Sequence, residues 1–138
     1  MVLVTVLYGF GYIAYATYGL QDVPSKKYYN KLLHFRVALR DFIICSAVAI
    51  WGYVRIQSGI TNETFVFAPI IFIPSLLLAN SIVKVTTKRN IIIATRWDAM
   101  PEDYKWHVDG IMTIILLTTP LIICGYFMNY LKFGEIFR

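Results

Sequence analysis

The sequence predicts an all-α polytopic membrane protein, with four transmembrane helices and interfacial amphipathic segments in one membrane domain over residues 1–138. Two observations lead to this fold class. The chain is 58% hydrophobic and only 15% charged, which is too apolar for a soluble domain of 138 residues. The apolar residues also gather in long blocks, and a helix needs roughly 18 such residues to cross a bilayer. We expect spans at about 1–20, 37–56, 65–83 and 110–131.

The first block, residues 1–20, is an apolar run rich in tyrosine. Tyr8, Tyr12 and Tyr15 follow helical spacing, with Tyr18 one turn further, so that they share one helix face. Phenol groups in lipid need hydrogen-bond partners. We therefore expect this face to pack against protein.

The second apolar block, residues 42–54, is short, but a helical pattern continues on both sides of it. Residues 21–25 indicate a helix stop and restart, because Pro24 suits a first turn and Asp22 or Ser25 can cap it. We expect one helix from about residue 25 to residue 55, with its basic first half at the headgroups. Small residues share a face of its second half and favour close packing in lipid: Ala38, Cys45, Ala49 and Gly52.

The last two blocks contain prolines, at Pro69, Pro74 and Pro120. Membrane helices tolerate proline where neighbours satisfy the freed carbonyl, so we expect kinks in these spans. The connection between the two blocks, residues 84–108, interleaves basic residues with tryptophan. That mixture is typical of a segment that lies in the membrane interface.

The positive charges predict the orientation of the spans. Of the 13 Lys and Arg residues, ten lie in two alternate connections, five in each. They are Lys26, Lys27, Lys31, Arg36 and Arg40 in the first, and Lys84, Lys88, Arg89, Arg96 and Lys105 in the third. The positive-inside rule places both connections in the cytoplasm or matrix and both termini on the opposite side. The net charge of +5 therefore indicates contact with anionic lipid headgroups rather than with nucleic acid.

Charged residues near the ends of the spans are candidates for interhelical ion pairs. Asp41 and Asp109 are the acids closest to spans on the basic side, and Arg36, Arg40 and Arg96 are the available partners. Ionisable residues in a membrane are functional candidates by default, which keeps proton or ion handling as an alternative. At the rim of a span, however, we expect a structural pair.

The third connection also provides candidate lipid-binding residues, which combine positive charge with interfacial aromatic rings: Lys88, Arg89, Arg96, Trp97, Lys105 and Trp106. A doubly charged lipid such as cardiolipin would contact several of these cations at once. The alternative is that some of them pair with the acids of the same connection, Asp98, Glu102 and Asp103.

No catalytic or metal-binding pattern is evident in the sequence: it has no Ser/His/Asp arrangement, no phosphate-binding loop and no paired carboxylates within a span. We therefore predict that the protein is not an enzyme and holds no cofactor other than bound phospholipid. Haem ligation by His34 and His107 is an alternative, but both lie in charged stretches outside the spans. We expect Cys45 and Cys124, inside apolar blocks, to be buried small hydrophobes.

Three motifs follow one another in the second half of the chain: Ala94-Thr95-Arg96-Trp97, Lys105-Trp106, and Leu116-Leu117-Thr118-Thr119-Pro120-Leu121-Ile122-Ile123. This progression resembles the C-terminal half of the mitochondrial fission process protein family, whose members are multi-span inner-membrane proteins. The chain departs from the family at Cys124-Gly125, where the family has His-Pro. The resemblance implies the mitochondrial inner membrane, basic loops that face the matrix and no enzymatic activity, and it provides no catalytic residue to carry over.

Together these features predict a structural or accessory integral subunit of a larger inner-membrane assembly of respiratory-chain type. Its partners would be membrane lipids and the other membrane subunits of a hetero-oligomeric complex. Two alternatives remain open: a free-standing factor for inner-membrane morphology or fission, and a small transporter or haem-binding protein.

Overall fold

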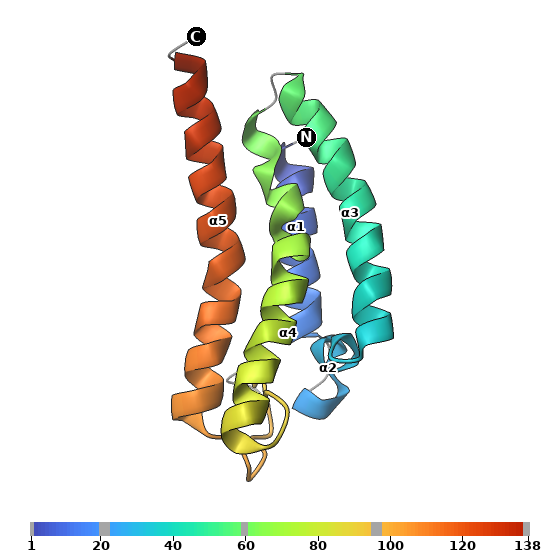
Figure 1. Cartoon of the computed structure of the whole chain (residues 1–138), viewed down its shortest axis with the longest axis vertical. Helices are drawn as coiled ribbons and strands as arrows, with labels where there is room; N and C mark the ends of the chain where they lie inside the picture. Colours follow the sequence, from blue (N-terminus) through green and yellow to red (C-terminus); the bar gives the residue numbers. More distant parts are fainter. Residues whose placement is uncertain (1, 20–22, 59–60, 95–97, 137–138) are drawn as a thin grey trace.

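The computed structural model describes residues 2–19, 23–58, 61–94 and 98–136, and within these ranges it contains helices but no strand. Four long helices lie side by side (Figure 1): α1 (Val2–Thr17), α3 (Phe35–Gln57), α4 (Ala68–Thr87) and α5 (Ile111–Ile136). Shorter elements connect them: η1 (Pro24–Lys26), α2 (Tyr28–Leu32), η2 (Thr61–Phe67) and η3 (Trp106–Gly110), the last a π-helical turn.

Three of the four predicted spans are long and apolar enough to cross a membrane. They extend over Phe35–Gln57, Glu63–Thr87 and Trp106–Lys132. The first apolar block also forms a helix, but α1 has only 16 residues. At 1.5 Å per residue it measures about 24 Å, whereas a bilayer core is about 30 Å thick. The structure therefore supports three spans, and α1 is a shorter apolar helix packed in the same bundle.

The prediction of one continuous helix from residue 25 to residue 55 is wrong. The helix is interrupted at His34, whose φ and ψ of −82° and 119° are extended, and α3 begins at the next residue. The cause is tertiary packing: Tyr29 and Leu32 of α2 are 2% and 0% exposed. The interruption lets α2 turn beneath the bundle (Figure 1), where these side chains are buried.

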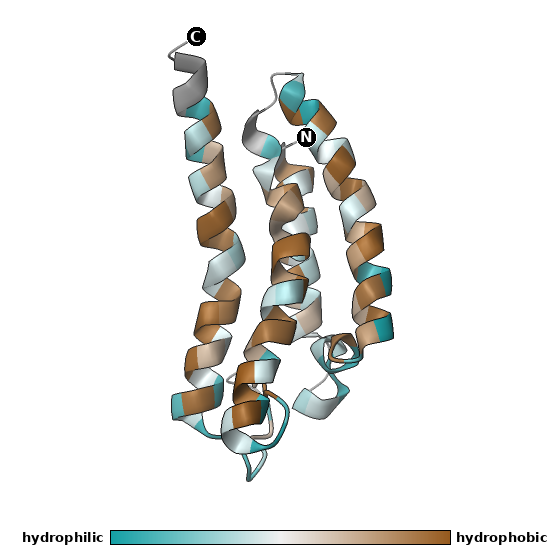
Figure 2. Ribbon diagram, in the orientation of Figure 1, coloured by the Kyte–Doolittle hydropathy of each residue, from teal (hydrophilic) through white to brown (hydrophobic). Residues whose placement is uncertain are grey.

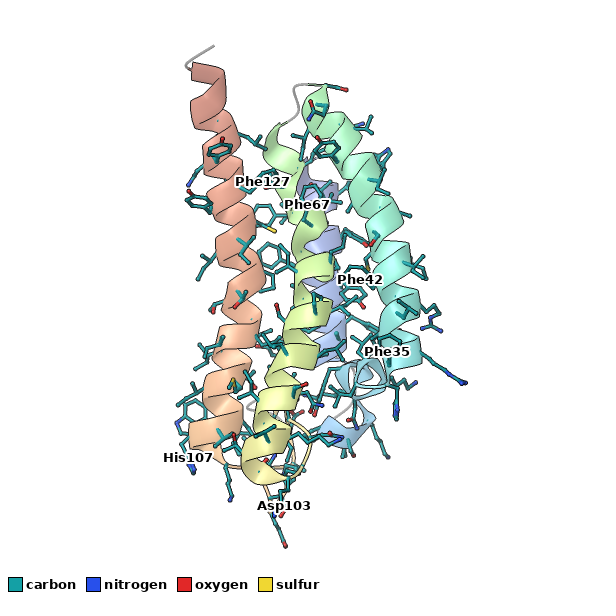
Figure 3. The ribbon with its side chains drawn as sticks, viewed as in Figure 1. Phe35, Phe42, Phe67, Asp103, His107 and Phe127 are labelled. Atoms are coloured by element: carbon teal, nitrogen blue, oxygen red, sulfur yellow. The ribbon has the colours of Figure 1, made fainter. Side chains whose placement is uncertain are left out.

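The core is centred on α4, which contacts each of the other three long helices. Its residues Phe72, Ile73, Leu76 and Val83 are at most 2% exposed. Pro69 lies in the first turn of α4, whereas Pro74 and Pro120 lie inside helices that continue past them. At the far end of the bundle, Phe67 and Phe127 bring η2 and α5 together (Figure 3), with ring centroids 6.1 Å apart.

Small residues allow the helices to approach one another closely. The predicted face of α3 is confirmed, because Ala38, Cys45, Ala49 and Gly52 are all buried. A Cβ atom at Gly52 would lie only 2.9 Å from Cγ1 of Val66 in η2. A Cβ atom at Gly9 of α1 would collide with the backbone carbonyl of Phe65, also in η2. The η2 turn can therefore pack closely between α1 and α3, because each of these helices has a glycine where it contacts η2. Cys124, like Cys45, is a buried free thiol.

The tyrosine face of α1 is buried only in part. Tyr8 and Tyr12 are half-buried, as predicted, but Tyr15 and Tyr18 are 58% and 53% exposed. The ring of Tyr15 instead packs at a tilt against that of Tyr28, with ring centroids 5.2 Å apart. These two exposed tyrosines lie at the end of α1 where the connections begin, and an amphipathic ring there can reach the headgroups.

Hydrophobic residues recur along all four long helices (Figure 2), and many large apolar side chains are exposed, among them Leu7 on α1, Ile43 on α3 and Ile122 on α5. In the apolar stretch that includes α4, 44% is buried within the bundle, whereas in the stretch that includes α5 only 17% is buried. On this last helix, the exposed rings of Trp106 and Tyr126 are 20 residues apart in sequence, which corresponds to about 30 Å along a helix. Aromatic rings at that separation match the two interfaces of a bilayer.

Candidate functional site

Charged residues that pair with one another gather at one end of the bundle, where α1 and α4 end and α3 and α5 begin (Figure 1). The side chain of Arg40 is 62% exposed, and those of the others are largely buried. Both strongly basic connections lie at this end, as the charge pattern predicts. We call this group the polar layer. Its members are Lys27, Arg40, Asp41, Arg89, Asp98 and Asp109, which form three ion pairs.

The first ion pair joins Asp109 to Arg89 at two points. The guanidinium nitrogens of Arg89 lie 3.0 Å from Oδ1 and 2.5 Å from Oδ2 of Asp109, which is fully buried. The backbone N–H groups of Ile92 and Lys105 donate to the same oxygens, at 3.1 Å and 2.9 Å. Four donors thus satisfy the carboxylate. Its hydrogen bond raises the pKa of the Arg89 guanidinium above the ordinary value.

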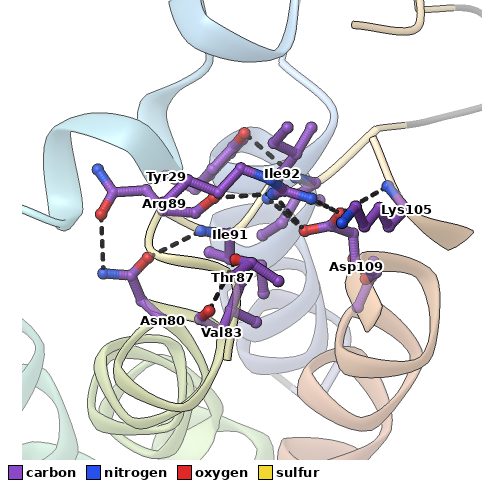
Figure 4. Close-up of polar contacts among 12 residues, drawn as sticks. Tyr29, Asn80, Val83, Thr87, Arg89, Ile91, Ile92, Lys105 and Asp109 are labelled. Carbon is purple, nitrogen blue, oxygen red and sulfur yellow. Dashed lines mark hydrogen bonds and ion pairs between the residues drawn. The ribbon is translucent and has the colours of Figure 1, made fainter. Parts of the chain in front are cut away.

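The segment that follows α4 is held in place by side chains from three elements (Figure 4). Lys88 ends α4 in the left-handed conformation, with φ of 57°. The backbone N–H groups of residues 91–93 then donate in turn to Oδ1 of Asn80 at 2.9 Å, Oδ1 of Asp109 at 3.1 Å and the hydroxyl of Tyr29 at 3.1 Å. The side chains of Ile91 and Ile93 are buried. An irregular chain can therefore cross the foot of the bundle without losing backbone hydrogen bonds.

The second ion pair joins the two basic connections. Nζ of Lys27 lies 2.5 Å from Oδ2 of Asp98, and these side chains are 0% and 3% exposed. A cation as deeply buried as Lys27 needs its partner, because an unpaired buried charge carries a large desolvation cost. The pair therefore fixes the first connection against the third.

The third ion pair lies at the start of α3. The Nε and Nη2 atoms of Arg40 donate to Oδ1 of Asp41 at 3.0 Å and 2.9 Å. The hydroxyls of Tyr12 and Tyr28 donate to Oδ2 at 3.1 Å and 2.6 Å. Burial raises the pKa of the Tyr28 phenol, and the adjacent Asp41 raises it further, so this hydroxyl keeps its proton to a higher pH than an ordinary tyrosine. Asp41 thereby links α1, α2 and α3.

The predicted ion-pair residues are thus only partly brought together. Asp41 pairs with Arg40 of its own helix, and its links to other helices run through tyrosines that the sequence did not indicate as partners. Asp109 pairs with Arg89, which was predicted to contact lipid. Arg36 is exposed and forms no ion pair with another described residue. Arg96 lies outside the described residues.

Only some of the predicted lipid-binding residues are exposed and free to contact lipid. Lys88, Lys105 and Trp106 are exposed at the basic end, whereas Arg89 is bound to Asp109. Arg96 and Trp97 lie outside the described residues. Among the acids of the third connection, Asp98 pairs with Lys27 of the first connection, and Glu102 and Asp103 are exposed.

The opposite end of the bundle holds one further charged pair. Nε of Arg55 lies 2.8 Å from Oε2 of Glu63, which is fully buried, and the guanidinium lies 5.1 Å from the ring centroid of Trp51. This pair joins α3 to η2. Oε1 of Glu63 and the hydroxyl of Thr64 lack a hydrogen-bond partner within the described ranges.

The contacts of the polar layer are typical of a structural network that holds elements together. Asp41 and Asp109 each accept four hydrogen bonds from this chain, so their carboxylates have little capacity left for a substrate. His34 and His107 are both exposed, and no cluster of potential metal ligands occurs among residues 2–19, 23–58, 61–94 and 98–136. Comparison of the chain with protein-family models, with curated proteins and with solved structures finds no match.

Proposed function

We propose that this chain is a structural or accessory integral membrane subunit of a larger mitochondrial inner-membrane assembly of respiratory-chain type. The observation that carries the proposal is the contrast between its two kinds of surface. The buried charges of the polar layer are paired within the chain, whereas the long faces of α3 and α5 are apolar and exposed.

The polar layer supports a structural role because it makes the bundle rigid at one end. Hydrogen bonds from Tyr12 and Tyr28 to Asp41 connect α1, α2 and α3. The other two ion pairs join the two basic connections and hold the segment after α4 against η3, which leads into α5. Fully satisfied buried networks rigidify a fold. A rigid scaffold of apolar helices is suited to hold its place among other helices.

The exposed faces support a partner within the membrane. Only 17% of the apolar stretch that includes α5 is buried by the chain itself, and this helix presents large apolar side chains to its surroundings along most of its length. These side chains include Ile111, Ile115, Ile122 and Tyr126. We therefore propose α5 as the helix that packs against another subunit.

The proposed placement has four spans, with the basic end in the matrix and both termini opposite. The positive-inside rule supports this orientation. A helix as short as α1 can cross a membrane where the bilayer thins or neighbouring helices shield its ends. The mitochondrial location is supported by the sequence resemblance to the fission process protein family.

Migration of the tagged chain on native gels in mild detergent tests the proposal. We expect it to migrate with a set of stoichiometric membrane partners. The double variant Ile115→Ala/Ile122→Ala on α5 should reduce recovery of that complex, whereas Ile43→Ala/Ile50→Ala on the exposed face of α3 serves as the matched control. Migration at the mass of the chain with detergent alone would contradict the proposal and favour a free-standing membrane factor.

A further inference from the structure

A cavity of about 390 Å³ lies between the end of α1 and the start of α5, next to the polar layer. Thr17, the last residue of α1, and the next residue Tyr18 line one side of it. Ala94 and Tyr104 line it from the third connection, and Thr113 and Leu117 from α5. From Gly110 to Leu117 it follows α5 for seven residues, or about 10 Å. Its volume lies within the range of roughly 300–1,000 Å³ that is usual for small-molecule sites.

One wall of the cavity is built by Trp106 and Gly110. A Cβ atom at residue 110 would collide with the indole ring, so only glycine lets Trp106 lie flat against the helix backbone there. The ring nevertheless remains 65% exposed, at the edge of the cavity. It therefore stands at the mouth, at the depth where tryptophan usually marks the membrane interface.

The polar groups of the cavity are suited to an oxygen-rich ligand. The hydroxyls of Thr17 and Thr113 donate to backbone carbonyls of their own helices, at 2.8 Å and 2.7 Å. The remaining donors are the hydroxyls of Tyr18 and Tyr104 and the indole N–H of Trp106, which have no partner within the described part of the chain. Ester and phosphate oxygens accept such hydrogen bonds. The deeper lining, which includes Leu117, is apolar.

The charge around the cavity favours an anion. Once the three ion pairs are set aside, the described cations at this end are Lys26, Lys31, Arg36, Lys84, Lys88 and Lys105. The corresponding acids are Glu102 and Asp103, which leaves six positive charges against two. Lys105 is exposed and does not line the cavity, although both of its neighbours in sequence do. An anion would therefore be attracted by the combined positive charge of this end of the bundle rather than by contact with one side chain.

We propose that the cavity binds one anionic phospholipid, with an acyl chain along α5 and its ester and phosphate oxygens at the aromatic mouth. This site goes beyond the structural role proposed above and does not depend on it. Lipid would enter from the membrane between α1 and α5.

Tryptophan quenching by brominated lipid tests the site in the full-length chain. In the variant Trp51→Phe/Trp97→Phe, Trp106 is the remaining tryptophan. The protein is placed in phosphatidylcholine nanodiscs that contain a small fraction of brominated phosphatidylglycerol or, separately, of brominated phosphatidylcholine. One near-surface cation contributes about 1 kcal/mol of attraction, so phosphatidylglycerol should reach half-quenching at an about fivefold lower fraction.

Replacing one of two alanines of the third connection by leucine distinguishes lipid bound in the cavity from lipid of the bulk bilayer. Ala94→Leu fills the cavity and should abolish the preference, whereas Ala99→Leu, at an exposed position of the same connection, should retain it. Equal quenching by the two lipids, no quenching, or a preference that survives Ala94→Leu would overturn the proposal. Native mass spectrometry of the wild-type chain gives an independent measurement: one retained phosphatidylglycerol supports the site, and none contradicts it.

Discussion

Arg89 and Asp109 form a two-point ion pair that joins the segment after α4 to the turn before α5, although they are 20 residues apart in sequence. The Asp109 carboxylate also accepts two backbone N–H groups, from Ile92 and Lys105. Asp109 therefore sets the path of the chain as well as balancing a charge, and its loss should affect both.

Asp109→Asn should destabilise the folded protein by about 3 kcal/mol, because it leaves Arg89 without its partner. We take the low end of the usual range since the Arg89 side chain is 20% exposed and can reach solvent. Thermal unfolding in detergent, followed by near-ultraviolet circular dichroism, measures the change. Asp103→Asn, at an exposed acid of the same connection, should shift stability by no more than about 0.5 kcal/mol. Equal effects of the two variants would mean that the contacts of Asp109 do not stabilise the fold.

Lys27→Met should destabilise the protein by about 3–5 kcal/mol, because it removes the cation that lies against the buried carboxylate of Asp98. The double variant Lys27→Met/Asp98→Leu should recover most of that loss, since two apolar side chains carry no desolvation cost. Lys26→Met, at the exposed neighbouring position, is the control. Denaturant unfolding of the wild type, of the single variants Lys27→Met and Asp98→Leu, and of the double variant gives the coupling free energy, and a value near zero would exclude a significant pair.

The N-terminus should lie on the same side of the membrane as Ser58, and Ser25 on the opposite side, if α1 is a fourth span. Both serines are exposed: Ser25 lies in η1, before α2 and α3, and Ser58 directly follows α3. Single-cysteine variants at each, with Cys45 and Cys124 replaced by alanine, can be labelled with a membrane-impermeant maleimide. An N-terminal tag accessible from the same side as Ser25 would instead mean that α1 enters and leaves on one side.

The helix faces of this protein are predictable from its sequence because they depend on local spacing. Ala38, Cys45, Ala49 and Gly52 recur with helical periodicity, and all four are buried in the structure. The two basic connections likewise lie at one end, because an even number of helices runs between them. Such features need only the period of a helix and the order of the elements.

The sequence indicates Arg40, Asp41 and Asp109 as ion-pair candidates, but most of the pairing in the polar layer could not be predicted, because it depends on irregular backbone. Arg89 reaches Asp109 only after Lys88 adopts the left-handed conformation and the chain turns back beneath the bundle. The break at His34 has the same origin, since burial of Tyr29 outweighs the local preference for a continuous helix. Neither turn has a glycine or proline at the critical residue to mark it.

Ala49→Leu should destabilise the protein by about 1–3 kcal/mol, because the larger side chain overfills the closely packed face of α3. Ala49 is 4% exposed and lies one turn before Gly52, where the distance to Val66 is already short. Ala47→Leu makes the same chemical change on the exposed face of this helix and should have little effect. If both variants unfold at the wild-type temperature, the contact between α3 and η2 is looser than the structure indicates.

Alkaline pH should weaken the fold through Tyr29. Burial raises the pKa of this phenol above its ordinary value of 10.0, so the folded protein retains a proton that the unfolded chain releases. Stability from this group is therefore complete below pH 10.0 and declines as the pH rises toward the folded-state pKa. Tyr29→Phe removes this decline, but at neutral pH it costs about 1–3 kcal/mol, because the buried N–H of Ile93 loses its acceptor. Unfolding free energies of both proteins between neutral pH and pH 11 or so test this. The two curves should converge as the pH rises, and parallel curves would show that Tyr29 ionises without regard to folding.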